Sequence, residues 1–166
     1  MDNQIIDILI IFGAKQLLFL IALFLIVWFF RQSKKMRQEI FLFAMIVLPL
    51  TYAVAKIGSL LYFDARPFVV GNFIPLFSHI PDNGFPSDHT LLAGALAVIT
   101  FFYNKKTGLI FFLLSFLVGA SRVMAGVHHW MDVFGSLVIA LVMAYLIQKF
   151  VLPFLLETKA YKKYFV

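Results

Sequence analysis

Hydrophobic residues in this chain come in long uninterrupted blocks, not in the strict alternation that is typical of half-buried β-strands. Blocks of about 20 apolar residues are long enough for a helix to cross the hydrocarbon core of a bilayer. The pattern therefore predicts an all-α, polytopic membrane helix bundle with about five transmembrane helices, in one domain over residues 1–166. The spans that we expect are residues 17–30, 40–63, 87–103, 108–124 and 132–152.

Several features interrupt this pattern. Residues 5–12 are apolar but are separated from the first span by residues 13–16, which predicts a short amphipathic or interfacial segment, with one long tilted helix as the alternative. Pro49 lies in the middle of the second span and predicts a kink, because proline removes a helix hydrogen bond. Residues 104–107 are expected to form a tight turn, and Pro153 is expected to end the fifth span.

Basic residues gather at one face of the predicted bundle, in the short connections between spans. Cytoplasmic loops of membrane proteins carry an excess of lysine and arginine. The bias predicts a multi-pass protein of the inner (plasma) membrane, with the N-terminus outside, the C-terminus in the cytoplasm and the loops 64–86 and 124–131 on the extracytoplasmic side. The basic residues of the cytoplasmic face are Arg31, Lys34, Lys35, Arg37, Lys105, Lys106, Lys149, Lys159, Lys162 and Lys163.

Composition excludes several classes of function. The chain is 63% hydrophobic and 13% charged, so its net charge of +6 comes from membrane-flanking residues and not from a basic patch on a soluble fold. A nucleic-acid partner is therefore not expected. The chain contains no cysteine, which excludes disulfides, thiol catalysis and cysteine-based metal sites.

Ionisable residues concentrate at three places on the predicted extracytoplasmic side. Ionisable side chains at membrane depth are costly and usually functional. Each group lies at the outer end of a predicted span, so the three groups are expected to converge. They are Asp64-Ala65-Arg66-Pro67-Phe68, Phe85-Pro86-Ser87-Asp88-His89, and Ser121-Arg122 followed by Gly126, His128 and Asp132.

The residue types in these groups fit phosphoryl transfer. Guanidinium groups such as those of Arg66 and Arg122 match phosphate oxygens in a bidentate manner. Ser87 begins a predicted helix, where a hydroxyl and backbone N–H groups can hold anionic oxygens. Gly126 is expected to permit a turn with positive φ or a close approach of the ligand.

A nucleophile and an acid can be assigned in the same way. His128 and Asp132 are four residues apart, which is one helical turn. An aspartate that accepts from Nδ1–H fixes the tautomer and leaves Nε2 as a nucleophile. His89 is then free to act as a general acid. The result is a phosphoryl-transfer site that needs no metal and no cofactor.

Several of these residues also have another interpretation. Zinc could use His89, His128, His129 and Asp132, but adjacent histidines do not easily face one ion and nearby arginines repel a cation. Asp88 could favour a helix dipole or stand beside the phosphate. Lys56 could contact phosphate or pair with a carboxylate such as Asp64. His79 and His129 are expected to be surface or interface residues.

The three motifs resemble those of the type 2 phosphatidic acid phosphatase superfamily, which shares its core with vanadium haloperoxidases. The resemblance covers residues 56–152 and departs from the pattern at two positions. Asp88 stands where the family usually has glycine, and Ser59 stands where it has a lysine, with Lys56 one turn earlier. The matching motifs are Arg66-Pro67, Pro86-Ser87-Asp88-His89 and Ser121-Arg122-x-x-x-Gly126-x-His128-x-x-x-Asp132.

Residues around the first two motifs look most like the undecaprenyl-diphosphate phosphatases of the bacitracin-resistance type. This resemblance implies hydrolysis of the terminal phosphate of the C55 lipid carrier through a phosphohistidine on His128. It implies that Asp132 orients His128 and that His89 protonates the leaving group. Arg66, Ser87 and Arg122 would bind phosphate, with Asp88, Lys56 and Gly126 as further candidates.

Two alternatives stay open. The first is a phosphatase for phosphatidate, phosphatidylglycerophosphate or a lipid A phosphate. The second is a non-catalytic protein that binds or transports a lipid phosphate. The expected partners are a polyprenyl or other lipid phosphate and membrane lipids, and a homo-oligomer is also open.

Overall fold

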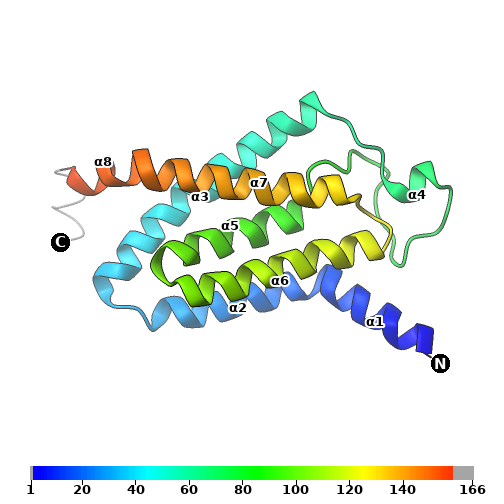
Figure 1. The fold of residues 1–166 in the computed structure, drawn as a ribbon, viewed down its shortest axis with the longest axis horizontal. Coiled ribbons are helices and arrows are strands. Elements are labelled where there is room, and N and C mark those ends of the chain that lie inside the picture. Colours follow the sequence, from blue (N-terminus) through cyan, green and yellow to red (C-terminus); the bar gives the residue numbers. More distant parts are fainter. Residues whose placement is uncertain (1, 159–166) are drawn as a thin grey trace.

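Helices account for all regular structure in the computed structural model, which describes residues 2–158 (Figure 1). Within that range there is no strand, and Ala65 and Asn83 form an isolated antiparallel bridge. The elements are α1 (Asp2–Lys15), α2 (Leu17–Phe30), α3 (Lys34–Leu61), α4 (Pro67–Val70), α5 (Asp88–Tyr103), α6 (Lys105–Met124), α7 (Trp130–Leu146), a π-helical turn (Ile147–Val151) and α8 (Leu152–Glu157).

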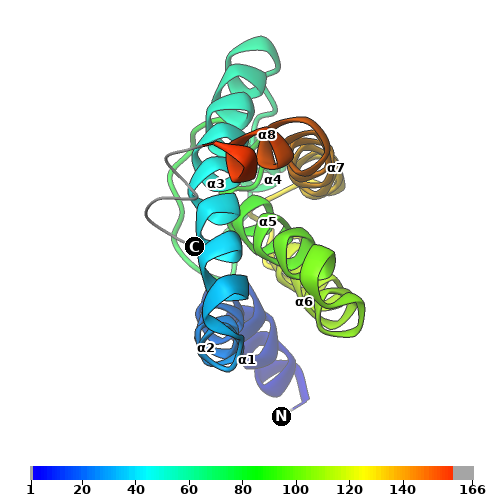
Figure 2. The ribbon, with the colours of Figure 1, turned by 90° about the vertical axis from the view of Figure 1, so that its left-hand side faces the viewer.

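Helix α5 is the centre of the bundle. It contacts α2, α3, α6 and α7, and the end-on view shows it between α3 and α6 (Figure 2). Small residues make this close packing possible: a Cβ on Gly94 would lie 3.1 Å from Leu137 Cδ2 of α7. Two buried alanines of α5, Ala93 and Ala97, pack against the α2 and α6 side chains. The bundle therefore fixes where the first residues of α5 lie.

The outer surface of the bundle is apolar. Large hydrophobic side chains such as Phe19, Leu113 and Phe134 are at least half exposed. A water-soluble chain would not leave so much apolar surface open, whereas lipid tails cover it without cost. The chain is a membrane protein.

Three helical segments are long and apolar enough to cross a membrane: Lys34–Leu61, Lys105–Met124 and Trp130–Glu157. A fourth span exists if α1 and α2, which are bent by 50° at their junction, count as one broken span. Helix α5 has 16 residues and is shorter than the usual minimum of about 17. The predicted number of about five spans is thus not confirmed.

Two details of the predicted spans differ in the structure. Pro153 does not end the last helix, because a π-helical turn precedes it and Pro153 then lies in the first turn of α8, where its missing N–H has no partner to lose. The predicted 104–107 turn shrinks to Asn104, whose side chain accepts from Thr107 N at 2.9 Å and starts α6 at Lys105. The residues around Pro49 stay in one helix, and the kink there remains a prediction.

The two ends of the bundle differ in character. The first residues of α3 and α6, which include Lys34 and Lys105, lie at one end. The long connection between α3 and α5, with α4 inside it, folds over the other end (Figure 1). Three of the predicted cytoplasmic lysines, Lys159, Lys162 and Lys163, lie outside the described residues.

Candidate active site

A polar cavity of about 280 Å³ opens at the end where α3 and α6 finish and α5 begins. All three sequence motifs contribute to its wall, so the predicted convergence is found in the structure. The lining residues are Lys56, Ser59, Arg66, His79, Asp82, Asn83, Phe85, Pro86, Asp88, His89, Arg122 and His128.

The innermost pair is His128 and Asp132, which are 2% and 0% exposed. Asp132 is the third residue of α7, and its Oδ2 accepts from the backbone N of His129 at 2.9 Å in a capping box. The same oxygen faces Nδ1 of His128 at 3.0 Å. A carboxylate can only accept, so Nδ1 carries the proton and Nε2 is unprotonated.

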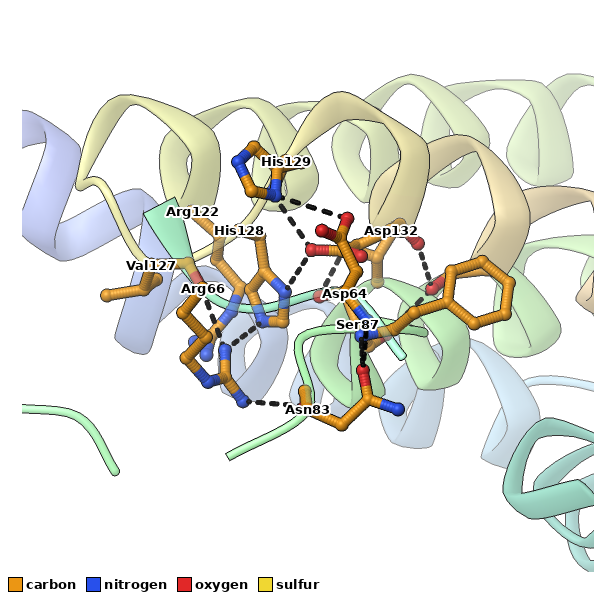
Figure 3. Close-up of polar contacts among 12 residues, drawn as sticks. Asp64, Arg66, Asn83, Ser87, Arg122, Val127, His128, His129 and Asp132 are labelled. Carbon is orange, nitrogen blue, oxygen red and sulfur yellow. Dashed lines mark hydrogen bonds and ion pairs between the residues drawn. The ribbon is translucent and has the colours of Figure 1, made fainter. Parts of the chain in front are cut away.

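The unprotonated Nε2 of His128 accepts from Nη1 of Arg66 at 3.3 Å, so that His128 lies between Arg66 and Asp132 (Figure 3). Burial, together with the charges of Arg122 and Arg66, lowers the pKa of His128 to about 2. The imidazole is therefore neutral at physiological pH, which is the form that can act as a nucleophile.

Arg66 directly precedes α4, is 5% exposed, and is held by hydrogen bonds to several groups. Its Nε donates to Asp82 Oδ1 at 2.7 Å, and its Nη1 donates to the carbonyl oxygen of Val127 at 2.8 Å. Burial acts to raise the pKa of Asp82, but its hydrogen bond to Arg66 and the charge of Arg66 outweigh that and lower it. Asp82 is thus an ionised partner for one guanidinium group.

Arg122 is 3% exposed and has a different set of partners. Its Nη1 donates to the carbonyl oxygen of Ala14 at 3.2 Å, and its Nη2 lies 3.0 Å from Nε2 of His79. Over residues 2–158, no carboxylate lies within ion-pair distance of Arg122, and its buried Nε has no hydrogen-bond acceptor. A buried cation without a counter-charge is costly, so this position is suited to an anionic ligand.

The rim of the cavity carries the remaining candidates. Nζ of Lys56 lies 3.5 Å from Oδ2 of Asp88, and both side chains are about half exposed. Lys56 therefore pairs with a carboxylate, as one of its two interpretations predicted, but with Asp88 and not with Asp64. His89, next in the chain, also lines the cavity and is partly buried.

Two predicted phosphate ligands do not line the cavity. Ser87 is fully buried, and its Oγ accepts from Thr90 Oγ1 at 3.1 Å. Gly126 has a φ of 78°, as its predicted turn requires, but a Cβ there would lie 2.6 Å from the Phe73 ring. The close approach at Gly126 is therefore made by a side chain of the protein, and its role in phosphate binding, like that of Ser87, remains a prediction.

Sequence reasoning missed three residues of the loop before α5: His79, Asp82 and Asn83. The Oδ1 of Asn83 accepts from the backbone N of Asp64 at 2.9 Å and of Phe85 at 3.0 Å, which ties the first motif to the second. Nothing in the sequence singles out Asn83 among the polar residues of a proline-rich loop. The four histidines share one side of the predicted bundle, which is the signal that could have placed His79.

Oxygen and nitrogen atoms that could bind a metal lie next to the His128–Asp132 pair. They belong to a different set of residues than the one that the sequence suggested. Asp64, His129 and Asp132 each offer one ligand atom, and these atoms lie within 4.8 Å of one another. His89 and His128, by contrast, face the cavity. Nδ1 of His129 already lies 3.1 Å from Asp64 Oδ2, and Oδ2 of Asp132 already has two donors. That the site needs no metal remains a prediction.

Comparison with known proteins shows clear relatives. The sequence model of the PAP2 superfamily matches residues 39–154. The chain is 32% identical to the undecaprenyl-diphosphatase BcrC of Bacillus subtilis over 149 residues, which are 89% of this chain and 76% of that protein. It is also 32% identical to the bacitracin transport permease protein BcrC of Bacillus licheniformis, over 80% of this chain and 65% of that protein. The crystal structure of Aquifex aeolicus LpxE matches with a TM-score of 0.62 and 26% identity, covering 88% of this chain and 87% of that one.

Proposed function

Because the chain belongs to the PAP2 superfamily and is a phosphatase, we propose that it removes the terminal phosphate of undecaprenyl diphosphate through a phosphohistidine intermediate on His128. The proposed substrate is supported by the similarity to a relative that is named for this reaction, of which the chain covers about three quarters of the length. The chemistry follows from the geometry of the cavity.

One observation carries the proposal. Two buried guanidinium groups, those of Arg66 and Arg122, line the same cavity as the unprotonated Nε2 of a buried and neutral imidazole, and only Arg66 has a carboxylate partner among residues 2–158. A phosphoryl group would supply the missing negative charge and would lie in reach of Nε2. Charge stabilisation of this kind is the main source of catalysis in phosphoryl transfer.

In the first step, Nε2 of His128 attacks the terminal phosphorus. The bond from phosphorus to the bridging oxygen breaks, and the electron pair stays on that oxygen. His89 donates a proton to the leaving lipid monophosphate, while Asp132 stabilises the cationic ring that now carries a proton on Nδ1 and a phosphoryl group on Nε2.

In the second step, the deprotonated His89 takes a proton from a water molecule. The oxygen of that water attacks phosphorus and the bond between nitrogen and phosphorus breaks, which releases inorganic phosphate. His89 is again protonated and His128 is again neutral. Arg66 and Arg122 hold the equatorial oxygens in both steps.

A second cavity supports a lipid as the substrate. It has about 270 Å³, lies between α3 and α5, and shares Asp88 with the polar cavity. Its other lining residues are Leu48, Thr51, Tyr52, Leu91, Leu92 and Ala95, which are mostly apolar. A polar cavity next to an apolar one fits a molecule with a phosphate head and a hydrocarbon tail, whereas a water-soluble phosphate would use the polar cavity alone.

The orientation in the membrane is part of the proposal. Lysines such as Lys34 and Lys105 lie at the end of the bundle opposite the cavity. The positive-inside rule then assigns the cavity and the N-terminus to the extracytoplasmic side of the inner membrane, and the C-terminus to the cytoplasm. Cysteine substitutions at Asn72 and Lys106, labelled from either side of sealed vesicles, test this orientation.

The function is tested by phosphate release from purified full-length protein in detergent micelles. We expect undecaprenyl diphosphate to be hydrolysed at least about tenfold faster than phosphatidate, phosphatidylglycerophosphate or a lipid A phosphate. Orthovanadate should inhibit, because it mimics five-coordinate phosphorus. EDTA should leave the rate largely intact. A preference for the monoesters would reject the substrate, and the absence of any phosphate release would favour a binding or transport protein.

A further inference from the structure

His79 lies inside the polar cavity but has no part in the two chemical steps. It comes from the connection between α4 and α5, and its ring is 6.2 Å from the ring of His128, in an edge-on arrangement. Phe77 packs against both His79 and Arg122: its ring lies 6.4 Å from the His79 ring and 6.0 Å from Cζ of Arg122. The imidazole is thus held in place beside the reacting groups.

The hydrogen bonds of His79 define its tautomer. Nδ1 lies 3.3 Å from the carbonyl oxygen of Ile80, which can only accept, so Nδ1 carries the proton. Nε2 lies 3.0 Å from Nη2 of Arg122, which can only donate, so Nε2 is the acceptor. Both contacts require the same neutral form. Burial lowers the pKa of His79, and the charge of Arg66 lowers it further, so the neutral form is present at pH 7.

Neutral acceptors hold Arg122 on both terminal nitrogens. Nη1 donates to the carbonyl oxygen of Ala14 at the junction of α1 and α2, and Nη2 donates to His79. Neither partner carries a negative charge. Arg66 differs, because the carboxylate of Asp82 already neutralises it and an arriving phosphate must compete with that carboxylate.

We infer that His79 is a positioning residue, which holds the guanidinium group of Arg122 as a fully charged site for the phosphoryl group of the substrate. This inference rests on the proposed function, in which Arg122 binds phosphate. His79 does not touch phosphorus and transfers no proton. Its contribution is to restrict the rotamers of a long side chain without reducing its charge.

The test measures the dissociation constant of orthovanadate, together with KM and kcat, for the full-length protein in detergent micelles. His79→Leu removes the acceptor at similar size and should weaken vanadate binding by about tenfold, because a hydrogen bond to a charged group is lost. KM should rise while kcat falls less. His79→Gln places an amide oxygen near the position of Nε2 and should bind vanadate within about threefold of the native protein. Ser78→Ala, an exposed neighbour, is the matched control and should equal the native protein.

A double-mutant cycle with Arg122→Lys separates positioning from a general effect on the loop. In the Arg122→Lys background, His79→Leu should weaken vanadate binding by less than about twofold, because its effect acts through the guanidinium group. An undiminished tenfold loss in that background, equal defects of the Gln and Leu variants, or native-like vanadate binding by His79→Leu would each overturn the inference. If His79→Leu does not fold, His79→Ala takes its place in the same cycle.

The binding readout keeps this inference separate from the proposed function. If the native protein binds vanadate but releases no phosphate from any lipid, the proposed function fails while the cycle still reports on His79. If lipid phosphate is hydrolysed and the cycle is additive, the proposed function stands and the positioning role is wrong.

Discussion

Two cavities lie between helices at opposite ends of the bundle, and they differ in volume and in the residues that line them. The larger, of about 480 Å³, lies between α2, α3 and α5 near the basic end and is lined by apolar residues such as Trp28, Phe29 and Phe41. The smaller, of about 280 Å³, holds two arginines, three histidines and two aspartates. Size alone would favour the apolar cavity, whereas the phosphoryl transfer that we propose needs charge and a nucleophile and not volume.

The largest effect should come from removing the nucleophile. His128→Ala is expected to lower kcat by at least about 10⁴-fold, since it removes the Nε2 atom that forms the proposed covalent intermediate. Phosphate release and trapping of the phosphoenzyme measure this. His129→Ala is the matched control, because the His129 ring pairs with Asp64 outside the cavity wall, and its loss should be at least about a hundredfold smaller. Native-like turnover by His128→Ala would remove the polar cavity from consideration as the active site.

The second largest loss of kcat is expected for a change at Asp132, which contacts the nucleophile His128. Asp132→Asn keeps the shape but offers an amide to Nδ1 of His128, which favours the wrong tautomer, and kcat should fall by about 10³-fold. The thermal unfolding midpoint should change little by comparison. A loss of activity that merely follows a loss of folded protein would show that Asp132 acts on stability only.

The guanidinium groups come next. Arg66→Lys retains the charge but loses the planar fork, and we expect kcat/KM to fall by about 50-fold and vanadate binding to weaken in parallel. Asp82→Asn serves as a companion variant, because it removes the carboxylate that competes for Arg66, and it should weaken vanadate binding far less than Arg66→Lys does. If Arg66→Lys kept native vanadate affinity, Arg66 would be a structural residue.

Lys56 at the rim should discriminate between substrates. A diphosphate has a second phosphate that a monoester lacks, and the half-exposed ammonium group of Lys56 lines the cavity that we propose binds it. Lys56→Gln is expected to lower kcat/KM by about fivefold for undecaprenyl diphosphate and by less than about twofold for phosphatidate. Equal losses for both substrates would indicate a general electrostatic effect of the rim.

The smallest effect should come from the apolar cavity. Ala44→Leu adds three carbon atoms to its wall, and we expect kcat/KM within about twofold of native and a thermal unfolding midpoint that rises by about 1–3 °C. The partner variant Phe41→Ala enlarges the cavity and should lower the midpoint. A tenfold loss of activity in Ala44→Leu would break the distinction between the two ends of the molecule.

Much of the fold follows from local sequence features. A helix is found over Leu17–Phe30, the range predicted for the first span, and the starts of α5 and α7 lie within two residues of the expected positions. The motif spacing that places Asp132 four residues after His128 correctly gave the hydrogen-bonded pair. These features depend on helical periodicity and on neighbours within one turn, which is information that a short window of sequence contains.

The rest depends on contacts between distant parts of the chain. Ser87 lies directly before α5, within one residue of its predicted place, yet the packing of α5 on α7 buries it behind the cavity wall, where Ser136 donates to its carbonyl oxygen at 3.0 Å. The acceptor that His79 presents to Arg122 comes from 43 residues away, and the one from Ala14 from 108 residues away. An irregular loop has no hydrophobic periodicity from which its side-chain positions could be predicted. Its side chains can be placed only when the helices that it covers are in position.

The sequence by itself determined a membrane-embedded helical chain with three polar motifs at helix ends and the types of residue needed for phosphoryl transfer. Only the tertiary structure decided which of those residues share one cavity, which are buried behind it, and that Arg122 has no counter-charge among residues 2–158. The physical reason is that residue type and helical period are local properties. Desolvation and unmatched charge, in contrast, are properties of a site and exist only after the helices have packed.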